Sequence, residues 1–450
     1  MRYRGISVYT NTTPRGAQRG PGQNEMAAVL APMTDKIAAE VGMDRIAFRR
    51  LNALRSDGFQ GGSQGPVTSS FIAEALDQGR RAFDWDAREA QSRDLGGSKK
   101  RGLGIGIGYH GAGGRGYDGL LKMGTNGTLH IHSGVGNLGT YSYAANCRAA
   151  AEAMQIPWEN CEIHRGRTDR HLPHSSGQGG SNTVFTHGRA MWVAAEDMIA
   201  KMKEIAAMDL GGSSDDYEIG GERVFQSSDP SQGLTYAQTA QRAIELGGKF
   251  DGQEYPDDIN PITQLATQGL AGTGLVGVAK DKIPGQGQPP GNIVGFCEIE
   301  LDTDTGKIEI TDYAGIADCG TVVHPKNFDN SMRGGMVWGV GLATLEKHVY
   351  DPQNGLPANT GLYQNKPPTN MDVPVDTIQQ AVNIPDPQSP IGARGIGEPT
   401  QGAMAAALAS AIRDALDGHM FNTAPTTTDM IIDHLAGNEY STKSLKTNTF

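Results

Sequence analysis

Cysteine is scarce in this chain of 450 residues. The four cysteines are scattered, and no two of them form a CxxC pair; they are Cys147, Cys161, Cys297 and Cys319. Iron–sulfur clusters and structural zinc sites take their ligands from closely spaced cysteines, so the sequence predicts neither within this chain. The pattern fits reduced thiols, which are typical of the cytosol.

Long apolar runs and an excess of positive charge are also missing. No stretch approaches the ~18 apolar residues of a membrane span, and residues 1–5 (MRYRG) lack the apolar core of a signal peptide. A net charge of −11 disfavours nucleic acid as a partner. We therefore expect a cytoplasmic protein with no membrane span and no bound nucleic acid, with export to the periplasm alongside a partner left open.

Glycine, by contrast, is abundant, with 62 residues and no collagen-like period. This content favours many turns and many places where the backbone approaches a neighbour closely. A chain of 450 residues can bury a large core and is long enough for two or more domains.

Hydrophobic patterning predicts two hairpins. Residues 120–123 and 128–132 flank a TNG turn, and residues 292–301 and 307–313 flank a DTDTG turn. Strand-like runs joined by such turns are typical of antiparallel pairs.

Apolar residues at helical spacing predict helices over residues 23–54, 144–154 and 400–417. Pro32 lies inside the first of these and should break or kink it, and Asp44 should cap its second part. The predicted fold class is α+β, with antiparallel hairpins packed with helices.

Residues 392–399 (GARGIGEP) form the most informative segment. Gly395 and Gly397 bracket Ile396 and leave the backbone open to a ligand, because glycine has no side chain. Glu398 follows immediately, before a proline that opens a helix, so its carboxylate is a candidate general base. On spacing alone, a helix cap with a glycine-rich entry is the favoured interpretation.

Other loops share this small-residue character. Residues 134–143 enter a predicted helix, and residues 175–183 (SSGQGGSNT) place small and hydroxyl residues in a row. Backbone N–H groups in such loops are suited to an anion or a pyrophosphate, although a flexible surface loop fits the second segment equally well. Near the start, residues 14–25 give an exposed path in which Arg19 offers five donors.

Taken together, these segments resemble the xanthine dehydrogenase/aldehyde oxidase family of molybdenum hydroxylases. Residues 392–398 are similar to the family signature G-(A/P)-(K/R)-G-(V/I)-G-E, whose glutamate is the base that activates a metal-bound hydroxide. The resemblance covers roughly residues 1–425. It implies Glu398 as the catalytic residue, and as cofactor-binding residues it implies Arg19, Gly20, Gly139, Thr140, Gly179, Gly180, Ser181, Arg394, Gly395, Ile396 and Gly397.

Three positions depart from the family pattern. Pro21, expected in the substrate pocket, replaces an aromatic residue that walls the pocket in the family. Tyr141 replaces a loop glycine, and Trp338 replaces a glutamine that contacts the cofactor. These departures leave the identity of the substrate open.

The resemblance also implies the chemistry. Molybdenum would be held by the dithiolene of molybdopterin, as the cytosine dinucleotide in a bacterial source, with no direct protein ligand. The reaction would insert water-derived oxygen at an electron-poor carbon, as in an N-heterocycle, with Glu398 as the general base. An aldehyde oxidase, a CoA-thioester-acting member and a non-catalytic assembly or scaffold subunit stay open as alternatives.

By the same resemblance, residues 1–95 are the C-terminal portion of a first molybdopterin-binding domain. Residues 96–435 are a second such domain, and residues 436–450 are a polar tail. Family subunits are nearly twice this long and carry a Phe-Gly-Gly loop that is absent here. We therefore expect the C-terminal half of a split subunit, partnered by a second molybdopterin-binding subunit, a [2Fe–2S] subunit and a flavin (FAD) subunit.

His130 and His132 alternate along a predicted strand and so point the same way. Two such side chains could ligate a metal ion, but no third ligand is near in sequence. A solvent-facing strand is the favoured interpretation.

Overall fold

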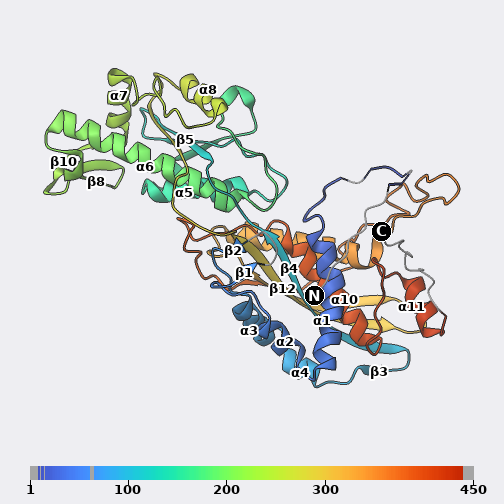
Figure 1. The fold of residues 1–450 in the computed structure, drawn as a ribbon. Helices are drawn as coiled ribbons and strands as arrows, with labels where there is room; N and C mark the ends of the chain where they lie inside the picture. The colour runs from blue at the N-terminus through green and yellow to red at the C-terminus, as the bar shows by residue number, and fades with distance from the viewer. Residues whose placement is uncertain (1–8, 11, 15, 61–64, 439–450) are drawn as a thin grey trace.

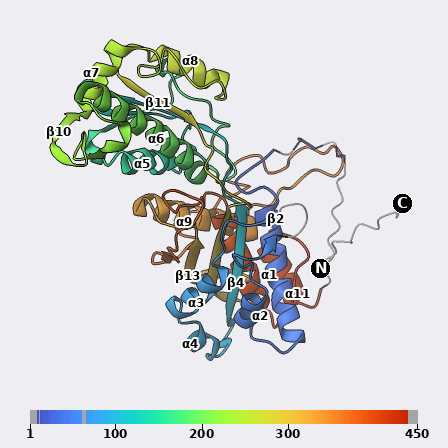
Figure 2. The ribbon, with the colours of Figure 1, turned by 60° about the vertical axis from the view of Figure 1, so that its left-hand side comes forward.

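The computed structural model describes residues 9–10, 12–14, 16–60 and 65–438. The chain forms two lobes, which Figures 1 and 2 show joined at a narrow waist. We call residues 118–281 the inserted lobe, because the chain enters it after one strand of the other lobe and returns before the next. We call residues 16–60, 65–117 and 282–438 the base lobe.

The base lobe is built on a sheet with the strand order β14-β13-β12-β4-β3. Its strands are β3 (Asp94–Gly96), β4 (Lys99–Gly111), β12 (Pro290–Asp302), β13 (Ile308–Asp318) and β14 (Ile378–Ala381). Neighbouring strands are antiparallel except β13 and β14, which are parallel. The predicted hairpin of residues 292–301 and 307–313 is confirmed as β12 and β13.

Helix α10 (Pro399–Ala415) lies directly against β4, because the middle of one face of that strand carries four glycines in a row. Gly102, Gly104, Gly106 and Gly108 alternate along β4, and a Cβ at any of them would come within 2.0–2.3 Å of the α10 backbone. The alternate side chains Leu103, Ile105 and Ile107 point to the opposite face, where they pack with α3. The glycine stripe therefore brings the helix N-terminus to the end of β4.

The N-terminal helices complete this lobe. They are α1 (Gln23–Glu40), α2 (Arg45–Leu51), α3 (Ile72–Ala82) and α4 (Trp85–Glu89). Asp44 caps α2 as predicted, accepting hydrogen bonds from the backbone N–H groups of Ile46 and Ala47. Of the predicted break or kink at Pro32, the break is wrong: α1 runs through this residue, because its alanine-rich face, including Ala27 and Ala31, is buried against α10. The kink stays a prediction.

The inserted lobe contains a second sheet with the strand order β11-β5-β6-β7. These strands are β5 (Asp118–Met123), β6 (Leu129–His132), β7 (Cys161–His164) and β11 (Leu275–Lys280). The predicted hairpin of residues 120–123 and 128–132 is confirmed, with Gly127 at a φ of 84° in its turn. Strands β6 and β7 are parallel, which hairpin patterning did not predict.

Helices and a small sheet surround this second sheet. They are α5 (Ser142–Ala153), α6 (Thr183–Leu210), α7 (Tyr236–Leu246), α8 (Pro261–Gly269), β8 (Tyr217–Gly220), β9 (Arg223–Gln226) and β10 (Asp229–Thr235). A fully buried Arg189–Asp281 ion pair links α6 to the segment that returns to the base lobe. Arg189 also donates to the carbonyl of Gln388 in that lobe, so the pair fixes the lobes relative to one another.

Further helices and short strands cover the base lobe: α9 (Pro325–Val340), a π-helical turn (Gly341–Leu345), α11 (Thr428–Leu435), β1 (Phe59–Gln60) and β2 (Gly65–Pro66). Among the described residues, no helix combines the length and apolarity that a membrane crossing requires.

The α+β fold class is confirmed by the mixture of hairpins and packed helices. The expected boundary near residue 95 falls within β3, which pairs with β4 in one sheet, whereas the lobes separate near residues 117 and 281. The division into residues 1–95 and 96–435 therefore stays a prediction about domain organisation. Most of the expected tail, residues 439–450, lies outside the described residues.

Candidate functional site

A cavity of about 830 Å³ lies where the two lobes meet. Loops from the inserted lobe form one side, and the 392–398 loop, the start of α9 and residues 17–21 form the other. Every site residue proposed from the sequence lines this cavity except Gly20, which contacts it through Glu398. The fold thus brings together segments that are up to 381 residues apart in sequence.

Glu398 is held at the cavity wall by groups from both lobes. The backbone N–H of Gly20 donates to Glu398 Oε1 at 3.1 Å, and Ser181 Oγ donates to Oε2 at 3.2 Å. Ser181 Oγ also accepts from the Glu398 backbone N–H at 2.9 Å, so one hydroxyl fixes both the loop and the carboxylate. The Glu398 side chain keeps 16% of its surface exposed, which leaves the carboxylate accessible from the cavity.

Arg19 lies behind Glu398. Its guanidinium donates to the carbonyl of Gly397 and, at 3.2 Å, to Thr400 Oγ1. Burial lowers the pKa of Arg19, and the charge of Glu398 opposes that shift. Asn24 joins the same segments by donating to the carbonyls of Arg19 at 2.8 Å and Glu398 at 3.3 Å. Arg19 therefore anchors the 392–398 loop as well as facing the cavity.

The Arg394 side chain points away from the cavity. Its fully buried guanidinium pairs with Asp318 and, at 3.2 Å, with Asp386. Asp318 Oδ2 in turn accepts from the backbone N–H of Phe71 at 2.8 Å. Only the backbone of Arg394 is thus available to a ligand, and its side chain holds the loop in place.

Two loops of the inserted lobe, residues 134–142 and 175–181, form one cradle. Gln178 connects them: its amide donates to Thr140 Oγ1 at 2.9 Å and to Ser142 Oγ, and its carbonyl accepts from the Leu138 N–H. The cradle also contains Gly139, Gly179 and Gly180. A Cβ at Gly139 or Gly179 would meet no atom within 4 Å, so both glycines border open space.

Four helix N-termini are directed at this cavity within the described part of the chain. Helices α5, α6, α9 and α10 begin at or beside residues that line the cavity. The N-cap residues of α5, α6 and α10 provide no side-chain cap to the first turn of the helix, whereas His324 caps α9. The unpaired N–H groups and the positive dipole ends at these positions favour an anionic ligand.

Two lining residues, His110 and Cys319, carried no recognisable signal in the sequence, whereas Trp338 is one of the three departures from the family pattern. His110, the penultimate residue of β4, places Nδ1 3.6 Å from Glu398 Oε2, and the same nitrogen lies 2.7 Å from the Gly111 carbonyl oxygen. Trp338 lines the cavity with the Arg19 guanidinium 5.7 Å from its ring centre. Burial raises the pKa of the lining residue Cys319 to about 12, so its thiol is protonated at neutral pH. Only the run of glycines beside His110 offered a hint of such a position.

Comparison with known proteins identifies this arrangement. A family model described as the molybdopterin cofactor-binding domain matches residues 78–374, and a second model of that description matches residues 1–53. The putative xanthine dehydrogenase molybdenum-binding subunit of Escherichia coli K12 is 26% identical over 97% of this chain and 56% of its own length. The gamma subunit of the 6-hydroxypseudooxynicotine dehydrogenase complex of Paenarthrobacter nicotinovorans is 26% identical over 96% of this chain and 53% of its own.

Solved structures show the same fold. Quinoline 2-oxidoreductase from Pseudomonas putida 86 superposes with a TM-score of 0.78 at 21% identity, covering 95% of this chain and 54% of that one. The Cu,Mo-CO dehydrogenase gives a TM-score of 0.75 at 20% identity, covering 92% and 52%. The chain therefore spans about half the length of the relatives that it matches.

Proposed function

Since this chain belongs to the family of molybdopterin cofactor-binding domains, we propose that it is the cofactor-binding part of a molybdenum hydroxylase in which Glu398 is the general base. The reaction would insert water-derived oxygen at an electron-poor carbon. The observation that carries this proposal is the Glu398 carboxylate, fixed at the cavity by Gly20 and Ser181 and open to it.

The cavity fits a phosphate-bearing pterin. Its volume of about 830 Å³ lies within the range of organic cofactor sites, and the uncapped starts of α5 and α6 suit phosphate groups. Backbone at Gly139, Thr140, Gly179 and Gly180 would hold the cofactor, with Ser181 nearer Glu398. A dinucleotide form, as molybdopterin cytosine dinucleotide, is part of the proposal because Gly136 and Gly139 of the 134–142 loop border open space.

When bound, the cofactor supplies an electron-pair acceptor and a metal that acidifies water. The protein supplies orientation and proton transfer. Glu398 accepts a proton at the oxygen that faces the cavity, while the N–H of Gly20 and the hydroxyl of Ser181 hold the carboxylate in one rotamer. Loss of such a base costs ~10²–10⁴ in rate.

The aromatic and apolar residues in the cavity wall favour a flat, apolar substrate. Trp338, Phe328, Val322 and Val323 all line it beside Pro21. Relatives are named for quinoline and for nicotine-derived compounds, so an N-heterocycle is the proposed substrate class. An aldehyde oxidoreductase subunit of Escherichia coli is also similar, at 24% identity, so aldehydes belong in the substrate panel.

The proposed assembly contains additional chains. Relatives are named as subunits of complexes, and each is nearly twice as long as the part that matches here. We propose that a second molybdopterin-binding subunit supplies the remaining cavity wall. Carriers of [2Fe–2S] clusters and FAD would accept the electrons, in the cytoplasm.

The test is Glu398→Gln in the purified complex. Glutamine keeps the size and one hydrogen-bond acceptor but removes the basicity, so kcat should fall ~10²–10⁴-fold with unchanged molybdenum content. Glu40→Gln, at the exposed end of α1, removes the same charge far from the cavity and serves as the matched control.

Near wild-type turnover of Glu398→Gln would reject the base assignment. Loss of molybdenum would make Glu398 a structural residue instead. A wild-type complex without molybdenum would favour a non-catalytic scaffold subunit.

A further inference from the structure

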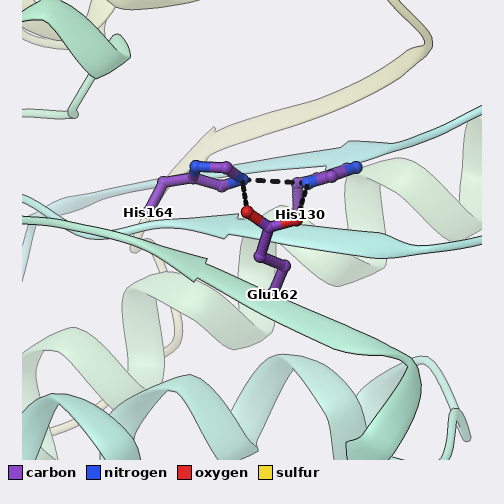
Figure 3. Close-up of side chains that lie close together, drawn as sticks. All are labelled: His130, Glu162 and His164. Atoms are coloured by element: carbon purple, nitrogen blue, oxygen red, sulfur yellow. Dashed lines mark hydrogen bonds and ion pairs between the residues drawn. The ribbon is translucent and has the colours of Figure 1, made fainter.

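A separate cluster of metal-ligating side chains lies on the sheet of the inserted lobe. Strands β6 and β7 run parallel, and their register places His130 beside Glu162 and His132 beside His164. Figure 3 shows His130, Glu162 and His164 converging on one point. The third ligand that sequence proximity did not supply comes from the neighbouring strand. The expectation of a solvent-facing strand is wrong for His132, which is 3% exposed.

One ligand atom from each side chain lies within 4.8 Å of the other two, and each histidine faces a different oxygen of the Glu162 carboxylate. His130 Nδ1 lies 2.9 Å from His164 Nε2 and 3.4 Å from Glu162 Oε2, and His164 Nε2 lies 3.5 Å from Glu162 Oε1. Tetrahedral zinc bonds of ~2.0–2.1 Å place ligand atoms about 3.3 Å apart. Small movements of the rings would therefore seat an ion between them.

We propose that His130, Glu162 and His164 bind one divalent transition-metal ion of the zinc type, at a site distinct from the cavity. Two imidazole nitrogens and one carboxylate form a donor set that suits zinc better than calcium or magnesium, which prefer oxygen ligands. The Glu162 side chain is 59% exposed, so solvent can reach the site and supply the fourth ligand.

The residues around His130, Glu162 and His164 affect a bound cation in two opposite ways. The His132 ring stacks on His164 at 4.7 Å and fixes its orientation, and His132 Nδ1 lies 3.1 Å from the carbonyl oxygens of Arg170 and His171. Lys122 stands opposite His130 on β5, and its positive charge, together with that of Arg170 near His164, opposes a bound cation. The negative charge of Glu162 offsets the positive charge of Lys122. Removal of the Glu162 charge should therefore weaken zinc binding strongly.

The position of the site gives it a structural consequence. The chain leaves β6 after His132 and enters the 134–142 loop, and it leaves β7 after His164 on the way to the 175–181 loop. Both loops line the cavity. A bound ion would clamp the parallel strands near their ends, from which the chain runs directly into the 134–142 loop and, after residues 165–174, into the 175–181 loop.

Zinc titration of the tag-free purified complex tests the proposal. After dialysis against EDTA, calorimetry with ZnCl₂ and metal analysis of the gel-filtered protein should show one tightly held zinc ion per chain. Co²⁺ should give the visible absorption of a tetrahedral site. Glu162→Gln and His164→Gln should each lower the zinc affinity at least ~10-fold, because even partners outside the inner shell are worth ~10–100-fold.

Glu218→Gln is the matched control, since it removes the same charge from an exposed position on β8. It should bind zinc as the wild type does. The proposal is overturned if the wild type retains no zinc, or if Glu162→Gln and His164→Gln bind zinc with unchanged stoichiometry and affinity. The alternative in that case is a hydrogen-bonded histidine pair that needs no ion.

Discussion

The contact between Gly395 and Ser181 is where the two lobes meet most closely at the cavity. A Cβ at Gly395 would lie 1.7 Å from the Ser181 carbonyl oxygen, whereas a Cβ at Gly397 would meet its nearest neighbour, Ser181 Oγ, at 3.6 Å. Gly395→Ala must therefore push the 175–181 loop back by more than about 1 Å to reach ordinary contact distance. Gly397→Ala fits without movement.

The energetic cost of this movement can be bounded. Overpacking of this kind costs ~1–3 kcal/mol. With an unfolding entropy of ~2.1 cal/mol/K per residue, a chain of this size loses only about 1 °C in unfolding midpoint for each kcal/mol. The expected drop in midpoint is thus about 1–3 °C.

The effect on the site should exceed the effect on stability. Ser181 Oγ makes the 2.9 Å and 3.2 Å hydrogen bonds that fix Glu398, and a retreat of about 1 Å would break both. Thermal unfolding and turnover are therefore measured together, with Gly397→Ala as the control for thermal stability. If Gly395→Ala matches the wild type in both measurements, the close approach of the lobes is not as described here.

Two further predictions concern buried charge. Asp318→Asn removes one of the two carboxylates that pair with the buried Arg394 guanidinium, while Asp386 remains, and should lower the unfolding free energy by ~1.5–3 kcal/mol in denaturant titrations; a change within ~0.5 kcal/mol would contradict the structural role of this pair. Burial lowers the pKa of His187 to about 4, below its unfolded value, so the unfolded chain binds the extra proton and stability falls as the pH drops from 6.5 towards 4. His187→Gln should remove up to about 3 kcal/mol of that loss, and an unchanged pH slope of the unfolding free energy would refute this.

Local chemistry explains what could be predicted from the sequence. Asp44 caps its helix because the cap bonds form within three residues, and Gly127 sits in a turn that favours positive φ. The 392–398 loop and the glycine-rich loops were found as motifs, and the structure gathers them around one cavity. Their assignment to individual cofactor contacts stays a prediction.

Other features depend on partners far along the chain. The helix α1 continues through Pro32 because burial of its face against α10 outweighs the lost hydrogen bond. Helix α10 lies more than 350 residues further along the chain, so local sequence patterns could not predict this packing. The parallel pairing of β6 with β7 joins segments separated by α5, so it produces no hairpin signal, and the convergence of His130, Glu162 and His164 went unseen with it.

The sequence by itself determined the two hairpins, the cap of α2, the glycine-rich backbone paths and the presence of a carboxylate at the start of α10. These follow from periodicity, turn chemistry and the lack of a side chain on glycine, all of which act over a few residues. Only the tertiary structure decided that Gly20 and Ser181 hold Glu398 and that Arg394 turns inward to Asp318. Those contacts join residues tens to hundreds of positions apart in sequence. They form because burial and charge pairing depend on which groups are close in space, and only the complete fold decides that.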